Sequence, residues 1–425
     1  MLGEGQNRPR TGADAEYCVI LEQVFAGMGA MTTTLDVFDD APAAVQDASV
    51  GLEVDVLDDP AAIASCWRDF ERKALMSPYQ SHAWVSAYDH CWQESRRPKR
   101  MLLRVRDGAG AVRALLPLDV FSRLGLTMAT MPGAGHANFH MPLLAHGAAP
   151  SADEWAEVLQ RAGQAAGIDL FTFRHQPQAW HGQENALAAV MSQPSPSNGY
   201  QLTVDFPAAE ARTRILSPKR RRVFKSKERA LSERGAFVPR LMESEEDVRR
   251  ALAAFLAQKA ERFAAQKIAN PFADPGIQAF LLAACLPQPD GSPPPLRLYA
   301  LLIGDEIVAT RAGTVWGTHI SVMFHSFDQR PEISRSSPAE VLFVYMIEAM
   351  AAEGFTHFDL GVGDLPYKRV FCKEVMELRD GIVPVSAKGR LLAPPLKAAV
   401  WAKRRVKQSE RLSALYQRLK PSPAA

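Results

Sequence analysis

Cysteine, net charge and long apolar runs are all scarce in this chain of 425 residues. Its five cysteines are scattered and never form a C-x-x-C pair, which argues against a disulfide framework and a zinc ribbon. The formal net charge of +2 gives no overall reason to expect a nucleic-acid partner. No run approaches the roughly 18 apolar residues of a membrane span, and the N-terminus lacks the basic-then-apolar order of a signal peptide. We therefore expect a cytoplasmic protein.

Length and composition indicate a globular chain with more than one domain. At 425 residues the chain exceeds the size at which a single hydrophobic core keeps growing. Its 30 prolines indicate many loop boundaries. Residues 1–50 show no sustained periodicity, and we interpret them as a disordered N-terminal tail. A loop rich in Ser and Pro then divides the globular part into domains at 51–199 and 200–390, followed by a C-terminal segment at 391–425.

The predicted elements follow the same order in both halves, where helices precede an antiparallel meander, a further helix and a last strand. In the first half they are a strand at 52–57, helices at 61–76 and 82–92, a hairpin at 101–105 and 112–120, a helix at 153–166 and a strand at 169–173. In the second half they are helices at 218–234 and 244–267, strands at 296–303, 307–316 and 319–327, a helix at 338–353 and a strand at 355–360. We therefore expect an α/β chain built from two copies of one unit.

The loop before the apolar helix of the second half has the features of an anion site. Ser337, Pro338 and Glu340 predict a capping box with a proline in the first turn, so the helix should begin at Ser337. A helix N-terminus presents unpaired amide groups and a positive dipole, which suit a phosphate. Arg330 and Arg335 would add charge-assisted hydrogen bonds. The alternative is an ordinary helix cap beside two solvated arginines.

The block from Phe358 to Lys368, with the pattern F-D-x-G-x-G-D-x-x-Y-K, follows as a strand, a glycine-containing turn and a short helix. Together with Ser337-Pro338 after an arginine-containing loop, it resembles the CelD-type acetyltransferases, a branch of the GNAT superfamily associated with bacterial cellulose biosynthesis. The resemblance extends more weakly over residues 52–390. It implies tandem GNAT-like domains, similar to those of the Fem-type peptidoglycan aminoacyltransferases, with mixed and mostly antiparallel sheets flanked by helices.

The resemblance also implies where acyl-CoA would bind. The acyl end would lie where the fourth and fifth strands of the C-terminal repeat splay apart. The pyrophosphate would lie on the loop before the apolar helix, with Arg330, Arg335, Ser336 and Ser337 as its ligands. This loop carries Pro331 and larger residues where the usual GNAT phosphate loop has glycines.

Acyl transfer from a thioester requires a base for the acceptor and an acid for the departing thiolate. Tyr367 opens the short helix after the fifth strand, where GNAT enzymes commonly place a thiolate-protonating tyrosine, and Lys368 would polarise its hydroxyl or contact a phosphate. Asp359 alternates with apolar neighbours on its strand, so we expect it to face the cleft as the base. His325 is the alternative base because imidazole titrates near neutral pH. The competing interpretation is that Asp359 caps the turn while Tyr367 packs in the core.

Three further features have structural alternatives. The basic block at 212–229 would line an anionic substrate or form a solvated helix face, and RNA is disfavoured because Phe224 is its only aromatic residue. The basic amphipathic run at 397–420 would lie at the inner face of a membrane or dock on the protein's own core. His136 and His140 have the spacing of two metal ligands, but the surrounding prolines and glycines predict a loop, so we assign no metal.

The leading hypothesis is an acyltransferase that moves an acetyl or other acyl group from acyl-CoA to an amine or hydroxyl, on a sugar or a cell-envelope polysaccharide precursor. A second hypothesis is Fem-like transfer of an aminoacyl group from charged tRNA, which requires salt-dependent tRNA affinity. A third is a non-catalytic partner of a polysaccharide assembly machine.

Overall fold

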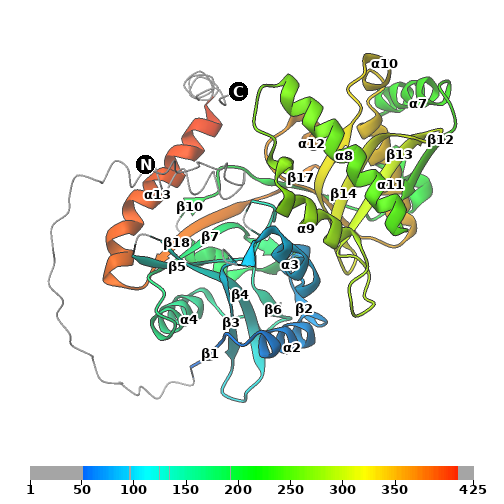
Figure 1. Cartoon of the computed structure of the whole chain (residues 1–425). Helices are drawn as coiled ribbons and strands as arrows, with labels where there is room; N and C mark the ends of the chain where they lie inside the picture. The colour runs from blue at the N-terminus through cyan, green and yellow to red at the C-terminus, as the bar shows by residue number, and fades with distance from the viewer. Residues whose placement is uncertain (1–50, 95–96, 124, 134, 192, 410–425) are drawn as a thin grey trace, which may run out of the picture.

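The structure, a computed structural model, describes residues 51–409 except 95–96, 124, 134 and 192. The predicted tail at 1–50 and the end of the C-terminal segment lie outside the described residues. Within the described residues, two sheets flanked by helices form two lobes that lie side by side (Figure 1).

The first sheet has nine strands, of which seven follow the order β1-β3-β4-β5-β7-β18-β10. These are β1 (Glu53–Leu57), β3 (Lys99–Arg106), β4 (Val112–Arg123), β5 (Leu126–Thr130), β7 (Leu170–Pro177), β18 (Leu378–Pro384) and β10 (Gln193–Pro194); β2 (Ala74–Leu75) and β6 (Leu143–Ala145) branch from this path. Its helices are α2 (Pro60–Glu71), α3 (His82–Tyr88), α4 (Ala152–Ala165), α5 (Ala186–Val190) and α13 (Ala387–Gln408).

The second sheet has seven strands in the order β12-β13-β14-β15-β16-β11-β17. These are β12 (Phe237–Leu241), β13 (Leu296–Ile303), β14 (Glu306–Trp316), β15 (His319–Phe327), β16 (His357–Val362), β11 (Gly199–Thr203) and β17 (Glu374–Met376). Its helices are α6 (Ala211–Ile215), α7 (Pro218–Ser232), α8 (Glu245–Ala265), α9 (Pro275–Cys285), α10 (Pro331–Ser334), α11 (Pro338–Ala352) and α12 (Pro366–Phe371); a small hairpin of β8 (Ala179–Trp180) and β9 (Gln183–Glu184) stands apart.

The seven strands along the main path of the first sheet correspond in order to the seven strands of the second sheet. In each described sheet one neighbouring pair is parallel, β5 with β7 and β15 with β16. The chain also exchanges strands between them. From β10 in the first sheet it passes directly to β11, which lies between β16 and β17 of the second sheet. From β17 it returns to β18, which lies between β7 and β10 of the first sheet. Each sheet therefore contains an inner strand that follows an edge strand of the other sheet.

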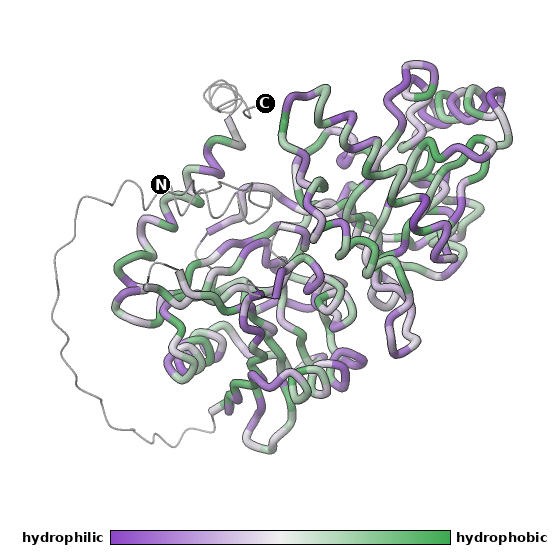
Figure 2. Tube along the Cα trace, viewed as in Figure 1, coloured by the Kyte–Doolittle hydropathy of each residue, from purple (hydrophilic) through white to green (hydrophobic). Residues whose placement is uncertain are grey.

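Apolar side chains join the two lobes into a continuous core. Trp84 and Tyr88 on α3 pack against Phe280 on α9, with ring centroids 5.3 and 5.4 Å apart. The other face of the second sheet has a separate core under α11, centred on residues such as Phe343. Figure 2 shows hydrophobic stretches within both lobes. At about 25 cal/mol per Å² of apolar area, burial of these large side chains is the main force that holds the lobes together.

Most predicted elements are confirmed, including both meanders and the helices that became α4, α7, α8 and α11. The helix predicted at 61–76 ends at Glu71, because the chain then enters β2. The loop predicted at 193–199 contains β10, and β18 had no counterpart in the prediction. His136 and His140 lie in a loop, as predicted. No described helix combines the length and apolarity needed to cross a bilayer.

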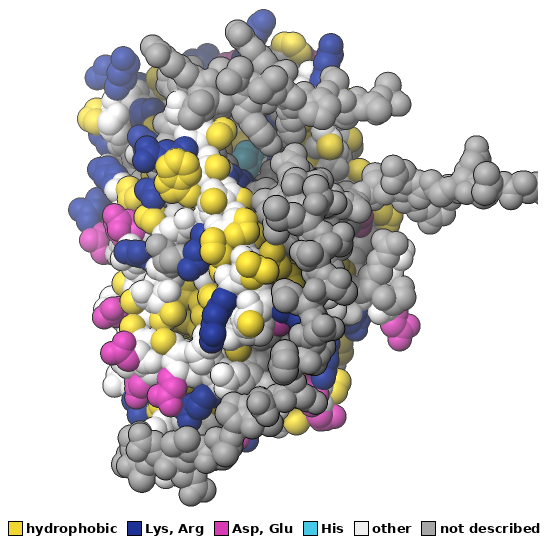
Figure 3. Space-filling model, turned by 90° about the vertical axis from the view of Figure 1, so that its left-hand side faces the viewer, with side chains coloured by type: hydrophobic (Ala, Val, Ile, Leu, Met, Phe, Trp, Pro, Cys, Tyr) yellow, Lys and Arg dark blue, Asp and Glu magenta, His cyan; other side chains and the backbone are white. Residues whose placement is uncertain are grey.

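Helix α13 begins at Ala387 and docks on the first sheet rather than standing free. Its inner residues Ala393, Leu396 and Val400 pack against β5, β7 and β18. Its outer face keeps Leu391 and Trp401 exposed. Figure 3 looks onto this side of the molecule and shows hydrophobic side chains interspersed with Lys and Arg. Docking on the protein's own core therefore accounts for one face of the amphipathic pattern.

Candidate functional site

The parallel strands β15 and β16 diverge after only three paired positions. Their Cα partners are His319 with His357, Ile320 with Phe358, and Ser321 with Asp359. Beyond these pairs, β15 and β16 continue separately. We call this divergence the strand fork. It lies at the carboxyl ends of two parallel strands, the edge at which open α/β sheets commonly bind ligands.

Three ionisable side chains gather at the strand fork from three different elements. Arg311 on β14 lies directly across from His325 on β15 in the antiparallel register. Tyr367 is the second residue of α12, and its ring centroid lies 6.2 Å from that of His325. The guanidinium of Arg311 lies 4.8 Å from the ring centroid of Phe343 on α11. The predicted pair of His325 and Tyr367 is thus together in the structure.

Burial sets the protonation states of this pair. The pKa of His325 is well below its ordinary value because the ring is desolvated and because Arg311 and Lys259 repel a second positive charge. The pKa of Tyr367 is raised, again mainly by desolvation. At neutral pH His325 is therefore uncharged and Tyr367 keeps its proton, while the same burial makes His325 a weaker base and Tyr367 a weaker acid than they are in water.

Lys368 fixes the turn that follows β16. Its ammonium donates hydrogen bonds to the carbonyl oxygens of Gly361 at 3.2 Å and Val362 at 2.8 Å. Burial lowers its pKa to about 8, while the nearby Asp359 acts in the opposite direction. These carbonyl contacts give Lys368 a role in shaping the fork, which differs from the expected contact with the hydroxyl of Tyr367 or with a phosphate.

Asp359 is fully buried and does not face the fork as the base that the sequence predicted. Its carboxylate is 2.7 Å from Nε2 of His319 and accepts hydrogen bonds from Oγ of Ser321 at 2.8 Å and from the amide of Gly361 at 2.7 Å. The strand alternation did turn it away from its apolar neighbours. The face to which it turned is covered by the other lobe, so the carboxylate is occupied by structural contacts.

The first lobe supplies the remaining members of this buried network. The hydroxyl of Tyr79 lies 2.9 Å from Oγ of Ser321. Asn138 donates from its side-chain amide to the Tyr79 hydroxyl at 2.5 Å and to the carbonyl of Val322 at 3.0 Å. On the other side, Nε2 of His181 lies 2.8 Å from Nδ1 of His319. Sequence reasoning missed these residues because their partners are far away in the chain.

The predicted capping box at the start of α11 is wrong. Ser337 stands at the N-cap position, but its backbone is left-handed with φ of 49°, and its side chain makes no capping hydrogen bond. Glu340 instead forms an ion pair with Nζ of Lys227 at 2.5 Å. A left-handed non-glycine residue carries strain of about 1–3 kcal/mol, and such residues cluster at functional sites. The helix start itself is where the sequence placed it.

The four predicted phosphate ligands have different surroundings. Arg330 pairs with Asp328 and, at 2.5 Å, with Glu306, so its guanidinium is already engaged. Arg335 is exposed, and no ion pair to it occurs among the described residues. Ser336 and Ser337 lie at the end of the loop, where Ser336 is buried. Of the two arginines, only Arg335 remains available to an external anion.

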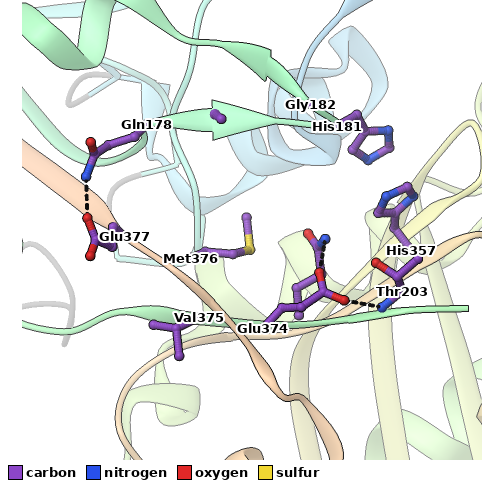
Figure 4. A pocket seen from close by; sticks show the side chains of 11 residues that line it. Gln178, His181, Gly182, Thr203, His357, Glu374, Val375, Met376 and Glu377 are labelled. Atoms are coloured by element: carbon purple, nitrogen blue, oxygen red, sulfur yellow. Dashed lines mark hydrogen bonds between the residues drawn. The ribbon is translucent and has the colours of Figure 1, made fainter.

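A pocket of about 500 Å³ lies elsewhere, where β17 and β11 face the β8–β9 hairpin (Figure 4). The rings of His181 and His357 stack in it with centroids 3.9 Å apart. Glu374 accepts hydrogen bonds from the side chain of Gln201 and the amide of Thr203. The pocket is next to the start of β16, whereas the fork opens toward its end. Across the described residues, no group of three or more His, Cys, Asp or Glu side chains is placed to hold a metal.

Residues 218–369 match the model of a family described as an acetyltransferase (GNAT) domain. The matched segment contains β15, β16 and α11 and ends within α12, after Tyr367, so it includes Arg311, His325 and Tyr367 of the strand fork. The match therefore assigns a GNAT-like acetyltransferase domain to this segment of the second lobe.

Solved structures of similar fold cover most of the chain. FemX is 9% identical with a TM-score of 0.53, and the match covers 78% of this chain and 98% of FemX. A conserved protein of unknown function from Bacteroides thetaiotaomicron is 9% identical with a TM-score of 0.51, over 78% of this chain and 100% of that one. A tandem GNAT protein from the clavulanic acid biosynthesis pathway is 11% identical with a TM-score of 0.43, over 79% and 99%. No curated protein sequence matches the chain.

Proposed function

We propose that this protein transfers an acyl group from acyl-CoA to an amine or hydroxyl at the strand fork. One observation carries the proposal. A partly buried, neutral His325 and a protonated Tyr367 lie 6.2 Å apart, ring centroid to ring centroid, on two elements that border the fork. This placement, inside the segment that matches a GNAT domain, supports the proposal that His325 serves as the base and Tyr367 as the acid.

In the proposed reaction, His325 accepts the proton of the acceptor as its nitrogen or oxygen attacks the thioester carbonyl. The carbon–sulfur bond then breaks, and Tyr367 donates its proton to the departing thiolate. The positive charge of Arg311 opposes the rise in the pKa of Tyr367 that burial causes, and so assists this donation. Asp359 and Lys368 act as positioning residues because they fix β16 and the turn before α12.

The resemblance to the CelD-type branch supports a sugar or a cell-envelope polysaccharide precursor as the acceptor. A cytoplasmic enzyme at the inner face of the membrane would meet such precursors. The exposed face of α13, with Leu391 and Trp401 next to Arg405, suits peripheral contact with an anionic bilayer. These assignments of acceptor and location are proposals that rest on the resemblance and on this surface.

A second candidate is aminoacyl transfer from charged tRNA, which one observation favours. Helix α7 presents five exposed cationic side chains, those of Lys219, Arg220, Arg222, Lys225 and Arg229. The phosphate backbone of a nucleic acid would bind such a surface in a salt-dependent manner. Arg212, by contrast, faces inward and pairs with Glu228 and Glu348. Calorimetry with acetyl-CoA and with bulk tRNA at two salt concentrations separates the candidates, and binding of neither would favour a non-catalytic partner protein.

The decisive variant for acyl transfer is Tyr367→Phe, assayed as thiol release from acetyl-CoA with a panel of amine and hydroxyl acceptors. Loss of the acid should lower turnover roughly 10²- to 10⁴-fold while acetyl-CoA affinity stays nearly unchanged. The matched control is Tyr345→Phe, which removes a hydroxyl that donates to Glu228 at 2.7 Å away from the fork. Unchanged turnover in Tyr367→Phe would remove this residue from the mechanism.

A further inference from the structure

Arg311 is a buried cation without a carboxylate partner among the described residues. Its side chain lies in the middle of β14, and the residue is only 3% exposed. Nη2 donates one hydrogen bond, to the carbonyl oxygen of Ala339 at 3.3 Å, whereas Nε and Nη1 are buried and make none within the described part of the chain. A guanidinium carries five N–H donors, so most of its capacity is unused.

Two other arginines with low side-chain exposure are paired with carboxylates. Arg100 binds Asp119 and Asp89 at 2.7 and 2.9 Å. Arg212 binds Glu228 and Glu348 in the same manner. Burial of an unpaired charge is strongly unfavourable, since the lost hydration is not replaced. Arg311 therefore differs from these two arginines by lacking the counter-charge that each of them has.

The surroundings of Arg311 are arranged to receive a negative group. Within the described residues, its one hydrogen bond goes to Ala339 in the first turn of α11, where the helix dipole is positive. That helix starts at the left-handed Ser337 without a side-chain cap. His325 and Tyr367 lie on the fork side, and neither carries a negative charge at neutral pH. Burial lowers the pKa of Arg311 to about 10, so it still carries its charge at neutral pH.

We propose that Arg311 is the receptor for an anionic oxygen group, a phosphate or a carboxylate, on a substrate that enters the strand fork beside α11. This inference rests on the proposed function for the assignment of the fork as a substrate site, and it adds the charge of the substrate. The planar guanidinium suits two parallel hydrogen bonds to such a group, which its free Nε and Nη1 could supply. Packing against the ring of Phe343 uses none of the five N–H donors of the guanidinium, so this contact alone does not explain an arginine at this position.

The first test measures anion-dependent thermal stability of the full chain, with pyrophosphate and succinate as probes at constant ionic strength and chloride as the comparator. We expect at least one probe to raise the melting temperature of the wild type with a saturable dependence on concentration. Arg311→Met should abolish this rise, and its melting temperature without anion should equal or exceed that of the wild type, because an uncompensated charge is gone. Arg240→Met, which removes an exposed partner of Asp247, should respond like the wild type.

Arg311→Lys is the second variant, for the case in which Arg311→Met does not fold. Lysine retains the positive charge but lacks the planar guanidinium. We expect its half-saturating anion concentration to rise at least fivefold. An anion response that is the same in the wild type and in both Arg311 variants would overturn the proposal. So would the absence of any response of the wild type to either probe.

Calorimetry with CoA and with phosphate-free pantetheine distinguishes the two sources of the anion. If Arg311→Lys weakens CoA but not pantetheine, the receptor holds a phosphate of the donor. If both bind as in the wild type while the succinate response is lost, it holds a carboxylate of the acyl group or the acceptor. Either result supports the proposal that Arg311 binds an anionic group. Both are binding measurements, so they can be interpreted even if the acyltransferase assay shows no turnover.

Discussion

The helices α4 and α11 occupy equivalent places in the two repeats, each before the second strand of the parallel pair, yet they begin differently. At α4 the hydroxyl of Ser151 accepts from the amide of Glu154, and the carboxylate of Glu154 accepts from the amide of Ser151 at 2.7 Å. At α11 the N-cap Ser337 is left-handed and makes no side-chain cap. In the first repeat, a serine side chain caps an amide group of the first helical turn. In the second repeat, the N-cap side chain does not do so, and the helix start remains available to other groups next to Arg311.

The two parallel pairs show the same difference. In the first repeat, α13 packs on β5 and β7 through Met128 and Leu170, and α5 has the apolar sequence Ala-Leu-Ala-Ala-Val. In the second repeat, the corresponding α12 carries Tyr367 and Lys368, and β15 carries His325. The parallel pair of the first repeat is thus covered by apolar side chains, whereas we propose chemistry for the pair of the second repeat. Substitutions at matched places in the two repeats test this difference.

The largest expected difference is in turnover. His325→Ala removes the proposed base and should lower turnover roughly 10²- to 10⁴-fold. Thr172→Val in the parallel pair of the first repeat should leave turnover within about twofold, because we assign no chemistry to that pair. Since the pKa of His325 is depressed, wild-type kcat/KM should decline with falling pH only well below 6.5, where the ring becomes protonated. A comparable loss of turnover in both variants would mean that the two repeats share the chemistry.

The next largest effect is on stability. Asp359→Ala removes the acceptor for Ser321 and Gly361 and the partner of His319, and leaves buried donors without partners. At about 1–3 kcal/mol for each buried unsatisfied group, the free energy of unfolding should fall by about 3 kcal/mol or more. Urea titration measures this loss, and Asp305→Ala in an exposed turn is the control. A loss below about 1 kcal/mol would show that the network is rearranged rather than broken.

Acid sensitivity should reside mainly in the first repeat. Burial lowers the pKa of His82 and His136 to about 4 and that of His140 and His181 to about 3. The unfolded chain binds these protons near pH 6.5 and the folded chain does not, so stability falls as the pH decreases below 6.5. Glu71 opposes this trend, since burial raises its pKa to about 7, and its cost appears as the pH rises above 4.5.

His140 gives the sharpest test of this pH dependence because both of its ring nitrogens are buried and make no hydrogen bond among the described residues. Between pH 6.5 and about 4.5, His140→Leu should remove about 2 kcal/mol of the acid-induced loss of stability. Urea midpoints of the wild type and the variant across this range provide the measurement. Parallel pH curves for the two proteins would contradict the assigned role of His140.

The smallest effects compare the two helix starts directly. Ser151→Ala should lower the free energy of unfolding by about 1 kcal/mol, because it removes a capping hydrogen bond. Ser337→Gly should raise it by up to about 1 kcal/mol, because glycine adopts the left-handed conformation without strain. Denaturation midpoints of the two variants measure these changes. A loss of stability in both variants would show that the two helix starts are equivalent.

Sequence periodicity predicted the repeated order of elements and the position of Tyr367 at the start of a short helix, because both depend on local patterns. The competing interpretation, in which Asp359 caps the turn, agrees with the hydrogen bond from the amide of Gly361. The pairing with His319 and the cover that Tyr79 places on Ser321 depend on long-range packing, which leaves no local signal. The capping-box prediction was wrong because the spacing of the serine and the glutamate carries no information on the left-handed backbone of Ser337. Arg311 did leave a signal, because it is the one charged residue of the strand predicted at 307–316.

The position of β18 between β7 and β10 makes the first sheet depend on a segment that follows the second sheet in the chain. A cut between β10 and β11 would leave the N-terminal fragment without β18, an inner strand of its sheet, and would open the hydrogen-bonding edges of β7 and β10 to aggregation, whereas the C-terminal fragment would keep all seven strands of the second sheet. The dependence therefore runs in one direction: the first lobe needs a strand that follows the second lobe in the chain, whereas the second sheet is built from one continuous segment.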